Sequence, residues 1–168
     1  RIRSTSAPST GRYATVFFKN NLFINRTNNA FQNVKEIVLE NNIFYKHAPQ
    51  GCSECTFTKN VTYQNNDNTI PYGDNIGSGN LVNTDPEFVN YPFLGGAHSW
   101  SYDYHLQVTS PLIGQATDGS DIGIYGGPLP VEFGSNPPIP QMTELTLPAS
   151  SVPVGGTLNV NFKAKKQD

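Results

Sequence analysis

The chain has 168 residues, a formal net charge of −2 and few charged side chains. Lysine and arginine are absent between Lys59 and Lys163, so the concentrated basic stripe that nucleic-acid binding requires is missing, and no apolar run is long enough to span a membrane. Glycine, proline, asparagine, serine and threonine are abundant, which favours strands and turns over helices.

The chain opens at Arg1, without a methionine or a signal peptide, and stops after Lys165-Lys166-Gln167-Asp168. We therefore expect it to be a piece of a longer protein, whose other domains would be its partners. One stretch, Asn28 to Glu40, has a helix-like composition, but the β-branched residues within it weaken that interpretation.

Four segments of the first half resemble one another. They are Val16–Phe23, Ile37–Phe44, Cys55–Thr62 and Gly79–Val82. They align on four asparagines: Asn21, Asn42, Asn60 and Asn80. The steps between these asparagines are 21, 18 and 20 residues, and a period of about 20 residues indicates repeated turns stacked on one another.

Apolar residues alternate before the first three of these asparagines, as a strand with one buried face requires, and Asn75 and Gly77 take their places before Asn80. One turn cannot bury its inner face alone, so we expect the turns to stack roughly 4.8 Å apart. Stacked asparagine amides then hydrogen-bond as a ladder. The residues that follow the asparagines are expected to point inward: Leu22, Ile43, Val61 and Leu81.

A second alignment, on Asn20, Asn41, Asn60 and Asn80, would stack Lys19, Glu40 and Lys59 with alternating charge. It breaks the apolar column after the asparagines, so the first alignment is preferred. The remaining alternative is that the asparagines simply mark surface turns.

Three further segments follow in order: Asn83-Thr84-Asp85-Pro86-Glu87-Phe88-Val89-Asn90, then Asp103 to Gly114, then Asp118 to Gly126. Together with the repeat, from about Tyr13 to Gly127, they resemble the C-terminal part of bacterial right-handed parallel β-helix proteins of the pectin-lyase-like superfamily. The resemblance implies an all-β fold and a secreted or cell-surface location. It also implies a polysaccharide as partner, and a closing segment that caps the end of the stack.

After Gly127 the repeat ends and the composition changes. We expect the β-helix and its cap in residues 1–127 and a proline-rich linker in residues 128–141. Residues 142–168 predict a pair of strands that resembles the start of an immunoglobulin-like surface domain.

No catalytic residue is predicted. Lyases of the superfamily hold Ca²⁺ on clustered acidic residues, but Glu36, Glu40 and Glu54 do not share a repeat position. Asp118 and Asp121 leave a Ca²⁺ site open as an alternative to a turn, and no other cofactor is expected.

Cys52, Cys55 and His47 lie close together in the sequence and are residue types that bind zinc. Fewer than four ligands are evident, so a buried thiol or a loop disulfide is preferred and no metal is assigned.

Trp100, Tyr102 and Tyr104 alternate in the sequence and are the candidate carbohydrate-binding residues, unless they cover the end of a core. The leading hypothesis is a non-catalytic C-terminal segment of a polysaccharide-associated β-helix protein. Two alternatives remain: part of an active polysaccharide lyase or hydrolase whose catalytic residues lie upstream, and a structural or adhesive surface module.

Overall fold

A computed structural model describes residues 2–3, 16–24, 29–93, 96–131, 141–147, 154–158 and 160–165. The elements in these residues are all strands, and the predicted all-β class is confirmed for them. The chain separates into two compact units, Arg1–Pro130 and Val131–Asp168, and each is described by itself.

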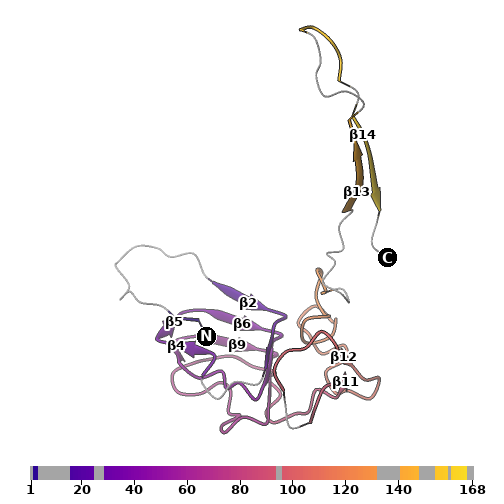
Figure 1. Ribbon diagram of the computed structural model, residues 1–168. Coiled ribbons are helices and arrows are strands. Elements are labelled where there is room, and N and C mark those ends of the chain that lie inside the picture. The colour runs from indigo at the N-terminus through magenta and orange to yellow at the C-terminus, as the bar shows by residue number, and fades with distance from the viewer. Residues whose placement is uncertain are drawn as a thin grey trace, which may run out of the picture. The chain divides into compact units, whose positions relative to one another are not determined.

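The first unit is built from short strands, most of them paired in parallel (Figure 1). The strands are β1 (Ile2–Arg3), β2 (Phe17–Lys19), β3 (Leu22–Ile24), β4 (Phe31–Gln32), β5 (Val34–Lys35), β6 (Val38–Glu40), β7 (Ile43–Tyr45), β8 (Cys52–Ser53), β9 (Thr56–Thr58), β10 (Val61–Tyr63), β11 (Phe88–Asn90) and β12 (Asp103–Leu106). Parallel sheets form in the orders β2-β6-β9 and β3-β7-β10, with smaller parallel pairs β1-β4 and β5-β8. Equivalent strands of successive repeats therefore lie side by side.

The register agrees with the alignment on Asn21, Asn42, Asn60 and Asn80. Leu22 pairs with Ile43, Ile43 pairs with Val61, and an isolated bridge joins Val61 to Leu81. The rival alignment is wrong: Lys19 does pair with Glu40, but Glu40 pairs with Thr58 rather than Lys59.

A left-handed residue precedes each aligned asparagine. Asn20, Asn41, Lys59 and Gly79 have φ angles of 53°, 57°, 55° and 69°. Such a residue turns the chain sharply, and asparagine and glycine tolerate this conformation best. In the first three repeats it separates the strand of the β2-β6-β9 sheet from the following strand of the β3-β7-β10 sheet.

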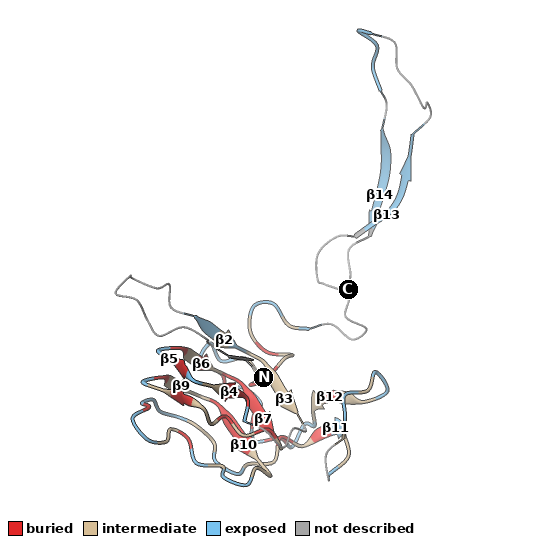
Figure 2. Ribbon diagram, turned by 60° about the vertical axis from the view of Figure 1, so that its left-hand side comes forward, coloured by how far each residue is buried: buried red, intermediate tan, exposed pale blue. Residues whose placement is uncertain are grey.

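Two hydrophobic cores lie against the sheets. The first core gathers Leu39, Phe44 and Phe57 with Phe31 and Cys55, among other residues. The second core holds side chains that alternate with Phe44 along β7, namely Ile43 and Tyr45. Burial rises from β2 and β3 to β7 and β10 (Figure 2).

This second core corrects one expectation. The residues after the asparagines do not join the first core. Leu22, Ile43, Val61 and Leu81 pack in the second core, against Phe88, Tyr104, Leu112 and Ile122 from the later part of the unit. The β3-β7-β10 sheet is therefore covered on both faces, which is the usual condition of parallel strands.

The later segment of the unit begins with the antiparallel pair β11-β12 and then runs back to the early repeats. Gly123 N–H donates to the Asn41 carbonyl, and Asn20 Nδ2 donates to the Gly123 carbonyl. The segment predicted to cap the end of the stack thus packs beside Asn20 and Asn41, the corner residues of the first two repeats.

The second unit contains the antiparallel strands β13 (Gln141–Thr146) and β14 (Asn161–Lys165). An ion pair of 2.6 Å joins Lys163 Nζ to Glu144 Oε2. The side chains described on these strands are exposed, including the apolar Met142, Leu145 and Phe162 (Figure 2). A two-stranded pair of this kind has little core of its own.

Candidate functional site

The four aligned asparagines form one hydrogen-bonded row. Nδ2 of each donates to Oδ1 of the next, over 2.9 Å from Asn21 to Asn42, 2.9 Å from Asn42 to Asn60 and 3.3 Å from Asn60 to Asn80. The same Oδ1 atoms accept the backbone N–H of the preceding asparagine, at 3.0, 3.1 and 2.9 Å.

Each of the later three asparagines also binds the preceding turn. Its Nδ2 donates to the carbonyl of Phe18, Leu39 or Phe57, at 2.7, 2.8 and 2.9 Å for Asn42, Asn60 and Asn80. At the corners these backbone groups have no partner within a strand ladder. The asparagine row supplies the hydrogen-bond partners that they need. Its role is structural, since Asn42 and Asn60 are completely buried.

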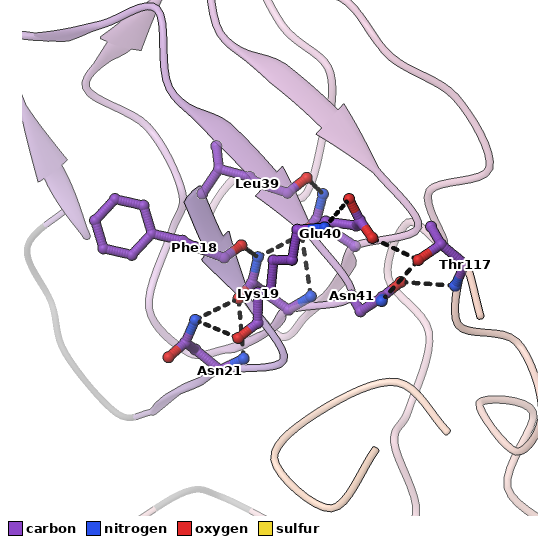
Figure 3. A network of polar contacts seen from close by, with 9 residues as sticks. Phe18, Lys19, Asn21, Leu39, Glu40, Asn41 and Thr117 are labelled. Carbon is purple, nitrogen blue, oxygen red and sulfur yellow. Dashed lines mark hydrogen bonds and ion pairs between the residues drawn. The ribbon is translucent and has the colours of Figure 1, made fainter. Parts of the chain in front are cut away.

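A second polar network surrounds Asn41, the left-handed residue that precedes Asn42 (Figure 3). Lys19 Nζ is 3.0 Å from Glu40 Oε2, and the Thr117 hydroxyl donates to Glu40 Oε1. Thr117 and Asn41 exchange two hydrogen bonds, of 3.0 and 3.1 Å. Burial alone would raise the pKa of Glu40, but the bonds from Thr117 and Lys19 lower it overall.

The three candidate carbohydrate-binding residues do not share one open face. Trp100 is 74% exposed, Tyr102 is partly buried, and Tyr104 is only 6% exposed within the second core. Trp100 lies in a turn before β12, so the extended alternation expected for the three residues starts too late to align them.

The exposed Trp100 ring is supported from beneath. His98 meets it edge to face, with ring centroids 4.7 Å apart, and His98 in turn stacks on Tyr104 at 5.9 Å. His98 Nδ1 lies 3.2 Å from the Tyr104 hydroxyl. The exposed indole ring therefore packs on His98, which packs on a buried tyrosine. Such packing fixes the position of the ring before a ligand binds. This role of His98 was not predicted, because it depends on the packing of three rings rather than on a sequence pattern.

Asp103 and His105 form a pair on β12. Their Oδ1 and Nδ1 atoms are 2.5 Å apart, and the His105 ring stacks on Tyr125 with centroids 3.7 Å apart. Burial would raise the pKa of Asp103, but hydrogen bonds from the backbone and ring of His105 lower it overall. His105 borders a small cavity together with Ile43, Ile122 and Tyr125.

The acidic residues considered for Ca²⁺ are engaged in turns. Asp118 Oδ1 accepts from the backbone and hydroxyl of Ser120, and Asp121 Oδ1 accepts from Gly114 N–H. The turn interpretation therefore accounts for both carboxylates. Within the part of the chain that the structure describes, no group of three metal-ligating side chains converges.

Cys52 and Cys55 are buried and unbridged. The Cys52 sulfur lies 3.2 Å from the Tyr72 hydroxyl. The neighbouring Cys55 thiol and burial raise the pKa of the Cys52 thiol. Buried thiols are thus the state that the structure shows for this pair.

Comparison with known proteins gave no match to a family model, a curated protein or a solved structure. Among the described residues, no helix has the length and apolar character needed to cross a membrane.

Proposed function

We propose that the chain is the non-catalytic C-terminal segment of a secreted or cell-surface, polysaccharide-associated protein, and that Trp100 contacts the polysaccharide. The observation that carries the proposal is the Trp100 ring, 74% exposed yet held by His98 on the buried Tyr104. Exposed aromatic rings suit sugars because their faces pack on the apolar faces of sugar rings.

We further propose that the stacked parallel strands belong to a right-handed parallel β-helix of the pectin-lyase-like kind. Three observations support it: parallel pairing between successive repeats, left-handed corners at matching positions, and the continuous asparagine row. In such a stack each repeat contacts its neighbours and positions the later loops that carry Trp100.

A non-catalytic role is favoured over catalysis in this segment because two acidic side chains of the repeats, Glu40 and Glu54, are held in ion pairs. Glu40 binds Lys19 and Thr117, and Glu54 lies 2.7 Å from Lys35 Nζ. A catalytic carboxylate pair needs two groups facing a common open space. Catalytic residues of a parent enzyme would then lie upstream.

Retention on immobilised neutral polysaccharides, such as cellulose, xylan and mannan, tests the proposal. The control substitution is Phe162→Ala, at a similarly exposed aromatic residue in the other unit. Trp100→Ala is expected to lower retention about tenfold on the polysaccharide that binds wild type, with little effect of Phe162→Ala. Equal retention of wild type and Trp100→Ala, with both folded, would refute the role of Trp100.

A further inference from the structure

A hollow of about 200 Å³ lies beside the aromatic cluster that supports Trp100. We call it the Phe93 hollow. Its lining residues are Tyr45, Asp85, Glu87, Phe88, Tyr91, Phe93 and Gln107. This volume lies below the roughly 300–1,000 Å³ of pockets for drug-sized ligands, so it suits one sugar unit better than an extended ligand.

The walls of the Phe93 hollow are aromatic and held in place. Tyr45 and Phe88 are buried, whereas the Phe93 side chain is 64% exposed at the rim. The Tyr45 hydroxyl donates to the Phe93 carbonyl at 2.8 Å, and the Tyr91 hydroxyl donates to the Gly96 carbonyl at 2.8 Å. These bonds fix the backbone on both sides of the rim, so the hollow is formed before a ligand arrives.

The polar groups of the hollow are chiefly acceptors. Asp85 Oδ1 accepts from Glu87 N–H, and Glu87 Oε2 accepts from the Thr109 hydroxyl. A carboxylate accepts about four hydrogen bonds, so both groups keep capacity for further donors. Gln107 adds an amide whose nitrogen already donates to the Phe88 carbonyl. Few polar groups on aromatic walls are typical of ligand pockets.

The charge of the hollow limits the sugars that fit. Two carboxylates line it, and six of its seven residues come from the stretch between Lys59 and Lys163 that contains no lysine or arginine. A uronate would bring a third negative charge to a partly desolvated space, which is unfavourable. Hydroxyl groups of an uncharged sugar instead donate to Asp85 and Glu87.

The hollow also connects with Trp100 through aromatic contacts. Tyr91 contacts Tyr104 at 5.4 Å between ring centroids, and Tyr104 stacks on His98, which supports Trp100. The two surfaces therefore share one packed cluster. This arrangement suits two contacts with one oligosaccharide.

We propose that the Phe93 hollow is a subsite for one uncharged sugar unit of the glycan that Trp100 contacts, with Asp85 and Glu87 accepting its hydroxyls and Phe93 packing on its ring. This assignment rests on the proposed function and adds the class of substrate: neutral glycans rather than polyuronates.

Isothermal titration of the full chain with cellohexaose, xylohexaose, mannohexaose, hexagalacturonate and a glucosamine hexamer tests the assignment. The variants are Phe93→Ala, the double amide Asp85→Asn/Glu87→Gln, and Trp100→Ala. Phe162→Ala is the matched control, because Phe162 is 65% exposed and Phe93 is 64% exposed. The amides keep the acceptor atoms for Glu87 N–H and Thr109, so the local fold is preserved, and unchanged unfolding midpoints verify it.

At least one neutral hexasaccharide is expected to bind wild type, and hexagalacturonate is not. Phe93→Ala is expected to weaken neutral binding about tenfold, and the double amide about fivefold, because hydrogen bonds to carboxylates are the stronger ones. The double amide should also admit hexagalacturonate.

The outcomes separate the two proposals. If Trp100→Ala abolishes binding while Phe93→Ala and the double amide leave it unchanged, the Phe93 hollow is overturned and the proposed function stands. If no hexasaccharide binds wild type, both fall. Binding of the glucosamine hexamer alone would make the hollow a cation site and overturn the neutral-sugar assignment.

Discussion

At the scale of single residues, the asparagine row shows what the sequence could and could not predict. The identity of its members followed from matched apolar columns around Asn21, Asn42, Asn60 and Asn80. The left-handed corner before each one was not predicted, because Asn20, Asn41, Lys59 and Gly79 share no side-chain chemistry. Their common property is a backbone conformation, and lysine rarely adopts it.

The row predicts unequal effects of removing its members. Asn42 is completely buried and bonds Asn21, Asn60 and the Phe18 carbonyl. Asn42→Leu should lower the free energy of unfolding by about 3 kcal/mol, because several buried groups lose partners. Asn21→Leu, at the partly exposed end of the row, should cost only about 1 kcal/mol. Urea denaturation measures both, and equal losses would contradict the row as described.

Gly77 explains why the last repeat departs from the pattern. It lies three residues before Asn80, the position that Phe18, Leu39 and Phe57 occupy in the earlier repeats. Its φ is 133°, and an added Cβ would lie 1.8 Å from the Phe57 carbonyl oxygen. The chain approaches too closely there for any side chain.

Substitution at Gly77 should therefore be costly. Gly77→Ala is expected to lower the free energy of unfolding by more than about 2 kcal/mol, through the clash and the backbone strain. Gly73→Ala is the control, because Gly73 also has a positive φ, of 60°, but an added Cβ would meet no atom within 4 Å. Thermal denaturation that shifts equally for both variants would rule out the close approach.

At the scale of elements, the main finding is the second core. The sequence predicted one buried face for the strand before each asparagine, but in β7, which follows Asn42, Ile43, Phe44 and Tyr45 are all buried. The sequence alone could not assign the second face, because its cover comes from residues such as Leu112 and Ile122, far along the chain. The local pattern does not encode which distant segment returns.

The hydrogen bond between Thr117 and Glu40 is one of the contacts that hold this segment against the repeats, and it should respond to pH. The pKa of Glu40 is lowered in the folded state, so its stabilisation is present above the unfolded-state pKa, near 4.5, and is lost as the pH falls through the folded value. Glu40→Gln should cost about 1 kcal/mol at neutral pH. Urea denaturation of wild type and Glu40→Gln across acidic pH checks this. The difference should shrink below the unfolded-state pKa, and a constant difference would contradict it.

At the scale of the whole molecule, the sequence predicted an all-β chain of stacked repeats, and the described residues have that class and parallel pairing. The candidate site was predicted only in part. Trp100 is exposed, whereas Tyr104 belongs to the core. Alternation in sequence places residues on one face only where the backbone is extended, and β12 begins after Trp100.

The non-catalytic proposal makes a direct prediction. The purified chain should release no unsaturated oligosaccharides from polygalacturonate, with or without added Ca²⁺. Among the described residues, no group of three acidic, histidine or cysteine side chains could hold Ca²⁺ beside a cationic base. Absorbance of the unsaturated product measures this. Product formation that a point substitution within the chain abolishes would show a catalytic site here.

The central claim is that Trp100 forms part of a surface for neutral glycans, and the composition of the chain makes it directly measurable. Trp100 is the single tryptophan, so fluorescence excited selectively in tryptophan rather than in tyrosine reports on this surface alone. Titration with neutral hexasaccharides should shift the emission to shorter wavelength in a saturable manner, as a sugar ring displaces water from the indole. Hexagalacturonate should leave the emission unchanged. An unaltered spectrum with every neutral hexasaccharide, or a saturable shift with hexagalacturonate alone, would contradict the account.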